Sequence, residues 1–224
     1  MRSKKTFAII GLGRFGQSVV KGLLDAKATV MVFDSDEDKV AKFADYVSYS
    51  AVVDATDEEE LMNCGINNAD HVIVAIGSDS QASITSVALL TEMGIKNITV
   101  KANSSNLERI YKRLGVEDVV SPERDSGYRT ALRLSHDSGI IKDYIDIGSK
   151  LAIVLLSISK STLLNVPLNQ LNLRNKFDIN IIAIKRQGEF FIPTADNVIK
   201  ANDELLIIGV ESELNNFESY AAKE

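Results

Sequence analysis

Residues 6–16 read TFAIIGLGRFG, a short apolar run followed at once by glycines at positions 11, 13 and 16. An apolar run of this length bounded by glycine predicts a buried strand. The following segment, residues 15–27, places Val19, Val20, Leu23 and Leu24 on one helical face. The stretch therefore predicts a strand, a glycine-rich turn and a helix in direct succession, which is how an α/β unit begins.

The same alternation of apolar runs and helical patterns continues to about residue 138. Strands are expected at 6–10, 29–34, 50–53, 71–76, 97–101 and 118–121, and helices at 15–27, 36–46, 57–64, 79–93, 104–114 and 122–138. Parallel neighbouring strands need crossover connections, and the expected helices supply them. The sequence therefore predicts an α/β fold, a doubly wound six-stranded parallel sheet of the Rossmann type.

The pattern changes after about residue 147. Strands are expected at 151–157, 180–185, 190–192 and 204–208, helices at 166–173 and 211–218, and Gly188 predicts a hairpin. Residues 140–147, which read IIKDYIDI, are expected to form a packed connection between two domains. We thus expect a Rossmann domain of residues 1–145 and a smaller α+β domain of residues 146–224.

Composition excludes several classes of protein. The chain has 25 Lys and Arg against 31 Asp and Glu, a formal net charge of −6, which argues against a nucleic-acid partner. The single cysteine, Cys64, excludes an internal disulfide framework and a multi-cysteine zinc site. The longest apolar run, 151–156, is far shorter than the roughly 20 residues of a membrane span. The basic N-terminus is followed by too short an apolar run for a signal peptide, so a cytoplasmic protein is expected.

The glycine pattern is followed by Asp34 at the end of the second expected strand. A strand, G-x-G-x-x-G, a helix and then an acid is the context that the dinucleotide-binding fingerprint requires. Gly11 allows the tight turn, Gly13 lets a phosphate approach the backbone, and Gly16 lets the helix pack closely against the sheet. Asp34 can accept hydrogen bonds from a ribose diol. The stretch therefore predicts a nucleotide with its phosphates at the start of the helix.

Arg14 lies inside this loop, where the phosphates are expected. A triphosphate gains more from an added guanidinium than a pyrophosphate, which backbone N–H groups usually satisfy. Other polar or small residues follow the expected strands and so belong to the same edge of the sheet; they are Asp54, Ala55, Thr56, Gly77, Ser78, Lys101 and Glu123. Lys101 is expected to meet another phosphate, and Glu123 to hold a divalent cation or to pair with Arg14.

The sequence lacks the common catalytic motifs. It contains neither G-x-x-x-x-G-K-[ST] nor G-x-S-x-G. His71, at the start of a strand, is expected to be structural, and His136 to lie on a solvated helix face; Cys64 is expected to be a small buried residue. We therefore expect a protein that is not an enzyme, with a small NAD-dependent oxidoreductase as the enzymatic alternative.

Five stretches together closely resemble the cytosolic RCK (regulator of conductance of potassium) subunits of bacterial Ktr potassium-uptake systems. They are GLGRFG at 11–16, Asp34, VIVAIG at 72–77, VKA at 100–102 and SPERD at 121–125. The resemblance implies a regulatory subunit that dimerises and forms an octameric ring beneath a membrane potassium-conducting subunit, at the inner face of the cell membrane. It also implies that ATP and ADP compete for the N-terminal cleft and shift the ring between activating and inactivating shapes.

Carried over by matching position, the resemblance implies a nucleotide site formed by Gly11, Gly13, Arg14, Phe15, Gly16, Asp34, Ser35, Asp36, Lys39, Asp54, Ala55, Thr56, Ala75, Ile76, Gly77, Lys101 and Glu123. In it Arg14 contacts the terminal phosphate, Asp34 holds the ribose, and Glu123 binds a divalent cation, magnesium or calcium, shared between two subunits. The resemblance further implies a cyclic di-AMP site in the second domain, at Arg174, Ile181, Ile182, Arg186, Ile192 and Pro193. An NAD(H)-sensing regulator remains the alternative, since the fold and Asp34 also suit adenosine diphosphoribose.

Overall fold

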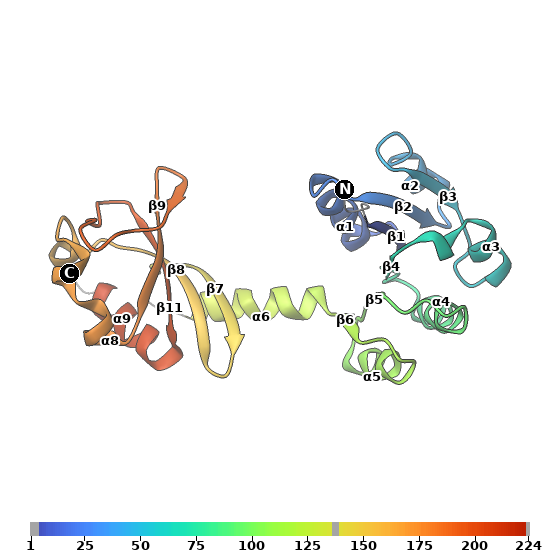
Figure 1. The fold of residues 1–224 in the computed structure, drawn as a ribbon. Coiled ribbons are helices and arrows are strands. Elements are labelled where there is room, and N and C mark those ends of the chain that lie inside the picture. Colours follow the sequence, from blue (N-terminus) through green and yellow to red (C-terminus); the bar gives the residue numbers. More distant parts are fainter. Residues whose placement is uncertain (1–4, 136–138, 223–224) are drawn as a thin grey trace. The chain divides into compact units, whose positions relative to one another are not determined.

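The computed structural model describes residues 5–135 and 139–222, and the chain divides into two compact units, Met1–Arg124 and Asp125–Glu224. Each unit has its own β-sheet (Figure 1). The division falls earlier in the chain than the expected boundary at 145/146, because Leu132 and Ile141 pack into the core of the second unit. None of the helices in the described residues is long and apolar enough to cross a membrane.

The first unit is built on a parallel sheet with the strand order β3-β2-β1-β4-β5-β6. Its strands are β1 (Thr6–Ile10), β2 (Thr29–Asp34), β3 (Tyr49–Val52), β4 (His71–Val74), β5 (Ile98–Lys101) and β6 (Asp118–Val120). The register pairs Ile10 of β1 with Phe33 on one side and with Val74 on the other. The strand order therefore reverses between β1 and β4, and a sheet of this kind places its ligand at the carboxyl ends of those strands.

Helices cover both faces of this sheet. They are α1 (Arg14–Asp25), α2 (Glu37–Ala41), α3 (Glu58–Asn63), the 3₁₀ helix η1 (Ile66–Asn68), α4 (Ser80–Glu92) and α5 (Ser105–Arg113). The next helix, α6 (Pro122–Ser135), begins in the first unit and continues into the second. One core contains Val20 of α1 and Val40 of α2, and the core on the other face contains Leu61 of α3, Leu90 of α4 and Tyr111 of α5. The prediction of a doubly wound α/β fold is confirmed.

One predicted helix of the first unit is shorter than expected. The helix expected at 36–46 is α2, Glu37–Ala41, with the side chain of Asp36 accepting a hydrogen bond from Lys39 N as its N-cap. After it the chain continues in tighter turns, in which Phe43 N bonds to Val40 O and Tyr46 N to Phe43 O. These i→i+3 bonds end the regular helix before the chain enters β3.

The second unit is an antiparallel five-stranded sheet with the order β10-β9-β11-β8-β7. The strands are β7 (Ile141–Gly148), β8 (Leu151–Ser157), β9 (Asn180–Arg186), β10 (Glu189–Phe191) and β11 (Glu204–Val210). The helices are η2 (Ser161–Leu163), α7 (Leu168–Leu171), α8 (Leu173–Phe177) and α9 (Glu211–Ala222). In α9, Leu214 and Phe217 pack on the sheet residues Leu205 and Ile207, so one face of the sheet is covered by helix (Figure 1). The expected hairpin at Gly188 is confirmed between β9 and β10.

Two predictions for this region were wrong. The connection expected at 140–147 is strand β7, which turns through Gly148 and Lys150 into β8 and buries Ile141 and Tyr144. The single helix expected at 166–173 is two helices, α7 and α8, because Asn172 adopts a left-handed conformation (φ 51°) between them. The end of the helix expected at 122–138 lies outside the described residues, and so does His136.

Candidate functional site

A cavity of about 800 Å³ opens at the carboxyl ends of the strands of the first unit. Its walls are formed by Ile10, Gly11, Gly13, Arg14, Phe15, Asp34, Ser35, Lys39, Val53, Asp54, Ala55, Thr56, Ala75, Ile76, Gly77, Ser78, Asp79, Ala82, Lys101, Asn103 and Glu123. These residues end or follow the strands β1 to β5, or lie in α2 or at the starts of α1, α4 and α6. The cavity is within the size range of small-molecule sites and lies at the switch point of the sheet.

The three glycines of the loop differ in how strictly the fold requires them. Gly11 has a φ of +96°, and a Cβ there would lie 2.9 Å from the amide nitrogen of Ile76. A Cβ on Gly16 would collide with the carbonyl oxygen of Gly11. Gly13 is different, because its φ of −69° suits any residue and no heavy atom in the described part of the chain lies within 4 Å of a Cβ there. The fold therefore needs Gly11 and Gly16, whereas the open space at Gly13 borders the cavity.

The start of α1 is shaped to receive an anion. Gly13 is the N-cap of this twelve-residue helix and provides no side-chain cap. The N–H groups of a helix start carry the positive end of the helix dipole and bind phosphates when nothing else caps them. Arg14, the first residue of the helix, is exposed and lines the cavity. Backbone and guanidinium donors thus lie at the same end of the cavity.

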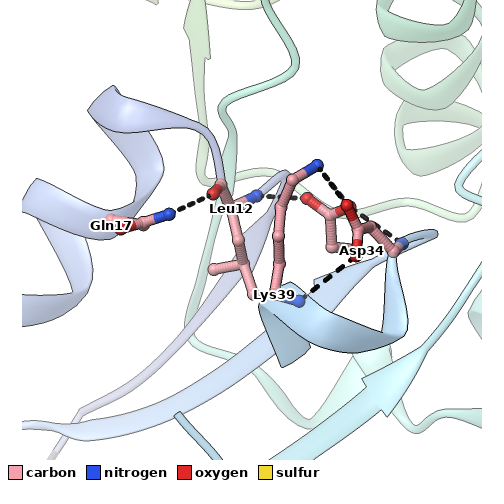
Figure 2. A network of polar contacts seen from close by, with 5 residues as sticks. Leu12, Gln17, Asp34 and Lys39 are labelled. Atoms are coloured by element: carbon pink, nitrogen blue, oxygen red, sulfur yellow. Dashed lines mark hydrogen bonds and ion pairs between the residues drawn. The ribbon is translucent and has the colours of Figure 1, made fainter. Parts of the chain in front are cut away.

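Asp34 fixes the glycine loop from the end of β2 (Figure 2). Its carboxylate is nearly buried, with 9 % of the side chain exposed, and Oδ2 accepts a hydrogen bond from Leu12 N at 2.5 Å. Oδ1 accepts from Asp36 N at 3.0 Å and pairs with Lys39 Nζ at 3.3 Å. On the other side of Leu12, Gln17 Nε2 donates to its carbonyl oxygen at 2.8 Å. The loop is held in shape before any ligand arrives.

Lys39 connects the two acids at this end of the cavity. Its ammonium lies 3.3 Å from Asp34 Oδ1 and 3.2 Å from Asp36 Oδ2. The hydrogen bond from Lys39 lowers the pKa of Asp36. Burial acts to lower the pKa of Lys39, but its hydrogen bonds and charge interactions with Asp36 and Asp34 outweigh this and raise it. These shifts favour the charged forms of Asp36 and Lys39 at neutral pH.

At the other end, Lys101 and Glu123 form a short ion pair. Lys101 Nζ lies 2.6 Å from Glu123 Oε1, and 11 % of the lysine side chain is exposed against 69 % for the glutamate. The ammonium also lies 6.0 Å from the ring centroid of Phe15 in the glycine loop. The hydrogen bond from Lys101 lowers the pKa of Glu123, and the charge of Arg14 adds to this effect. A positive charge is thus held beside the phosphate loop.

Between these two ends, a wall of the cavity is formed by the residues after β3 and β4. Val53 and Ala55 are buried and, with Ile76, give this part of the cavity an apolar surface. Asp54 Oδ1 accepts hydrogen bonds from Thr56 N at 2.9 Å and from Thr56 Oγ1 at 2.7 Å, and these lower the pKa of Asp54. A flat apolar group with polar edges fits such a wall.

The chain matches the models of two families, the TrkA-N domain over residues 7–122 and the TrkA-C domain over residues 153–222. It is 41 % identical over 218 residues to the Ktr system potassium uptake protein C of Bacillus subtilis (strain 168), which is 96 % of both chains. It is 36 % identical over 216 residues to the Ktr system potassium uptake protein A of the same organism, again 96 % of both chains. The chain belongs to the Ktr/Trk family of potassium uptake proteins.

Solved structures contain the fold of this Ktr/Trk family member. The GsuK channel matches with a TM-score of 0.69 and 16 % identity, over 100 % of this chain and 40 % of the channel chain. The TrkA-N domain of the inner membrane protein ybaL from Escherichia coli matches with a TM-score of 0.52 and 20 % identity, over 60 % of this chain and 99 % of that one. At these identities the likeness concerns the fold alone.

The structure brings together nearly all the residues that the sequence predicts for the nucleotide site of this Ktr/Trk protein. All of them line the cavity except Gly16, which supports Gly11, and Asp36, which pairs with Lys39. The prediction missed five wall residues, which are Ile10, Val53, Asp79, Ala82 and Asn103. Each of them lies at the end of a strand or at the start of α4, so the rule that placed Lys101 at this edge would also have found them.

The residues expected to bind cyclic di-AMP are spread over the second unit. Arg174 is on α8; Ile181, Ile182 and Arg186 are on β9; Ile192 and Pro193 follow β10. Of these six, only Arg186 lines a cavity of about 450 Å³ beside Lys200 and Asp203.

Arg186 already has partners within its own chain. Its Nε and Nη2 donate to the carboxylate of Asp203 at 2.9 and 2.7 Å, and Nη2 also donates to the carbonyl oxygen of Val198. Asp203 is 1 % exposed, so this bidentate pair neutralises a buried charge. The cyclic di-AMP assignment stays a prediction.

The remaining reactive side chains have structural roles. His71 Nε2 lies 2.7 Å from Thr99 Oγ1, which donates to Asp118 Oδ2, at the edge of the sheet opposite the cavity. Cys64 is buried; its thiol donates to Leu61 O, and burial raises its pKa. In the described part of the chain no three His, Cys, Asp or Glu side chains are grouped to hold a metal ion.

Proposed function

We propose that this chain is the regulatory subunit of a potassium uptake system and that it binds ATP and ADP in the cavity of the first unit. The names of the relatives, which are Ktr system potassium uptake proteins, support the regulatory role. The observation that carries the nucleotide assignment is the uncapped start of α1 at Gly13, with Arg14 and Lys101 beside it.

Each part of an adenine nucleotide has a matching wall. The phosphates lie against the backbone of Gly13 and Phe15, where helix N–H groups and two cations meet them. The ribose hydroxyls lie beside Asp34 and Ser35, and a carboxylate accepts hydrogen bonds from a diol. The base lies on the apolar wall after β3 and β4, close to Asp54. This order follows the fingerprint from phosphate to ribose to base.

Arg14 gives the site a means to distinguish ATP from ADP. A ligand shifts an equilibrium between two shapes only if it binds them unequally. A terminal phosphate held by the guanidinium supplies such a difference, because ADP lacks that group. Coupling free energies of this kind are typically about 1–3 kcal/mol. In an assembled ring of subunits this difference gates the membrane partner that conducts the ion.

The phosphate end of the cavity has the chemistry to hold a divalent cation, with Glu123 and the nucleotide phosphates as its ligands. Mg²⁺ is commonly held by one or two carboxylates together with nucleotide phosphates, so a complete protein cage is unnecessary. Glu123 offers one carboxylate, 69 % exposed, at the phosphate end of the cavity. The cation, when bound, neutralises charge between that carboxylate and the terminal phosphate, and a neighbouring subunit completes its coordination.

The test is a calorimetric titration of the full chain with ATP, ADP and NADH, read beside the mass from light scattering. We expect Arg14→Ala to weaken ATP binding by about tenfold or more, the value of one charge-assisted hydrogen bond, and ADP binding by less than about threefold. Arg113→Ala removes an exposed arginine from the last turn of α5 and is the matched control. Equal losses for ATP and ADP would refute the discrimination by Arg14, and a strict monomer with ATP bound would refute the ring.

One observation favours a second candidate, an NAD(H)-sensing regulator. The cavity continues past the phosphate loop to Ser78, Asp79 and Ala82 at the start of α4, which leaves room for a second nucleoside. The GsuK channel, which shares the fold with a TM-score of 0.67 at 15 % identity, has been solved bound to NAD. NADH binding clearly tighter than ATP binding in the same titration would favour this candidate.

A further inference from the structure

The Lys101–Glu123 ion pair occupies the place where the proposed function needs a free cation. Lys101 Nζ is 2.6 Å from Glu123 Oε1, close to Phe15 of the glycine loop. A Cβ on Gly77 would lie 3.2 Å from the same ammonium, so the lysine side chain lies directly against the wall of the cavity. Only 11 % of this side chain is exposed, and Glu123 is the charged partner that its ammonium contacts.

The two partners differ in how firmly they are held. Lys101 is the last residue of β5, inside the sheet, whereas Glu123 is the second residue of α6 and largely exposed. The carboxylate is therefore the partner that can leave at low cost, because water replaces its contacts. The lysine has no such alternative, since a partly desolvated ammonium needs an anion beside it.

We infer that Glu123 is an internal counter-ion that competes with the phosphates of a nucleotide for Lys101. The inference rests on the nucleotide site proposed above and concerns the state of that site without a divalent cation. A phosphate that reaches Lys101 must displace the carboxylate, and the displaced charge then lies close to the polyphosphate and repels it. Glu123 thus lowers the affinity for a metal-free nucleotide, and its displacement changes the contacts in the first turn of α6.

The effect of Glu123 on the affinity for a nucleotide has an expected size and sign. An exposed or partly exposed ion pair stabilises by about 0.2–1 kcal/mol, which is up to about fivefold in a binding constant. Removing the competing charge while keeping the side-chain shape should therefore tighten binding, and the repulsion of the displaced carboxylate adds to this gain. If Glu123 instead bound the nucleotide directly, removing its charge would weaken nucleotide binding.

The experiment is a calorimetric titration of the full-length protein with ATP, and separately with inorganic tripolyphosphate, in buffer containing EDTA. Glu123→Gln keeps the length of the side chain and removes its charge. The matched control is Glu108→Gln, which removes an acid that pairs with Lys112 and Arg124, outside the cavity. We expect Glu123→Gln to bind ATP and tripolyphosphate about fivefold more tightly than the unchanged protein, and Glu108→Gln to stay within about twofold.

The outcomes separate this inference from the proposed function. If all three proteins bind ATP and Glu123→Gln binds it equally or more weakly, the counter-ion is refuted and the nucleotide site stands. If Glu108→Gln gains as much as Glu123→Gln, the gain comes from net charge, and the inference is refuted in the same way. If none of the three proteins binds ATP, either in EDTA or with Mg²⁺ added, the nucleotide site itself is refuted, and the inference with it.

Discussion

Gly13→Ala should abolish most nucleotide binding without unfolding the protein. The backbone at Gly13 has φ −69° and ψ −175°, which alanine adopts without strain. A Cβ there meets no heavy atom of the described residues within 4 Å, so the folded chain has room for it. That space belongs to the cavity, directly over the start of α1, where the phosphates of the proposed ligand lie.

The magnitudes follow from these contacts. Alanine is a poorer N-cap than glycine by about 0.5–1 kcal/mol, but it also restricts the unfolded chain, which returns about 0.4–1 kcal/mol. The free energy of unfolding should therefore change by less than about 1 kcal/mol. A phosphate oxygen that accepts a backbone N–H needs an N···O distance of about 2.9 Å, and the new methyl group prevents that approach. Losing one hydrogen bond to a charged group costs about 1.5–3 kcal/mol, so the dissociation constant should rise by roughly ten- to one-hundred-fold.

Calorimetry with ATP gives the affinity, and thermal melting monitored by circular dichroism gives the stability. We expect an apparent melting temperature within about 4 °C of the unchanged protein. Unchanged ATP affinity in a folded Gly13→Ala protein would refute the placement of phosphates at the loop. A large loss of stability would refute the argument that the fold makes no demand on this position.

Three further predictions concern stability. Gly16→Ala places a methyl group against the backbone carbonyl of Gly11, which cannot move aside as a side chain would, so the free energy of unfolding in urea should fall by about 2–3 kcal/mol; an unchanged urea midpoint would contradict the contact. Burial holds the pKa of His71 below its ordinary value of about 6.5, so the unfolded chain binds more protons than the folded chain. Stability should therefore fall as the pH drops below about 6.5. His71→Gln should remove this part of the dependence of the melting temperature on pH between pH 5 and 7.5. Arg186→Met leaves the buried carboxylate of Asp203 without its bidentate partner and should cost about 3 kcal/mol in urea unfolding, whereas a cost below about 0.5 kcal/mol would show that the pair contributes nothing.

The first unit could be predicted well because each of its signals is local. A strand that ends at Gly11, a helix face of Val19 and Val20, and a helix stop at Gly65 each depend on neighbouring residues in the sequence. The carboxyl ends of parallel strands must meet at one edge, so Lys101 could be assigned to the site without knowing any distance. Local pattern and simple topology were sufficient for these elements.

The errors arose where a distant partner decides the outcome. Residues 140–147 mix apolar and charged side chains without strict alternation, and the pairing with β8 makes residues 141–148 strand β7. The bond between Arg186 and Asp203 joins residues 17 positions apart, and no local pattern connects them. The sequence also did not indicate the pairing of Glu123 with Lys101, while its expected role in holding a cation stays a prediction. Which of several nearby charges form a pair depends on side-chain geometry that the sequence does not contain.

The hydrogen bond from Leu12 N to Asp34 explains why a change of shape should begin elsewhere than at the glycine loop. That bond and the close packing of Gly16 against the carbonyl oxygen of Gly11 hold the loop in shape before a ligand binds. A loop fixed in this way loses little conformational freedom on binding, so more of the interaction energy appears as affinity. It also has few alternative shapes with which to signal occupancy.

The charges that can exchange partners lie beside this loop, in the Lys101–Glu123 ion pair. The exposed carboxylate of Glu123 pairs with Lys101, and Glu123 is the second residue of α6. The first unit ends and the second begins within this helix. A phosphate that takes Lys101 from Glu123 changes the contacts of the first turn of α6 and leaves the glycine loop as it was. Under the proposed function, the glycine loop therefore contributes affinity and the exchangeable ion pair contributes the response.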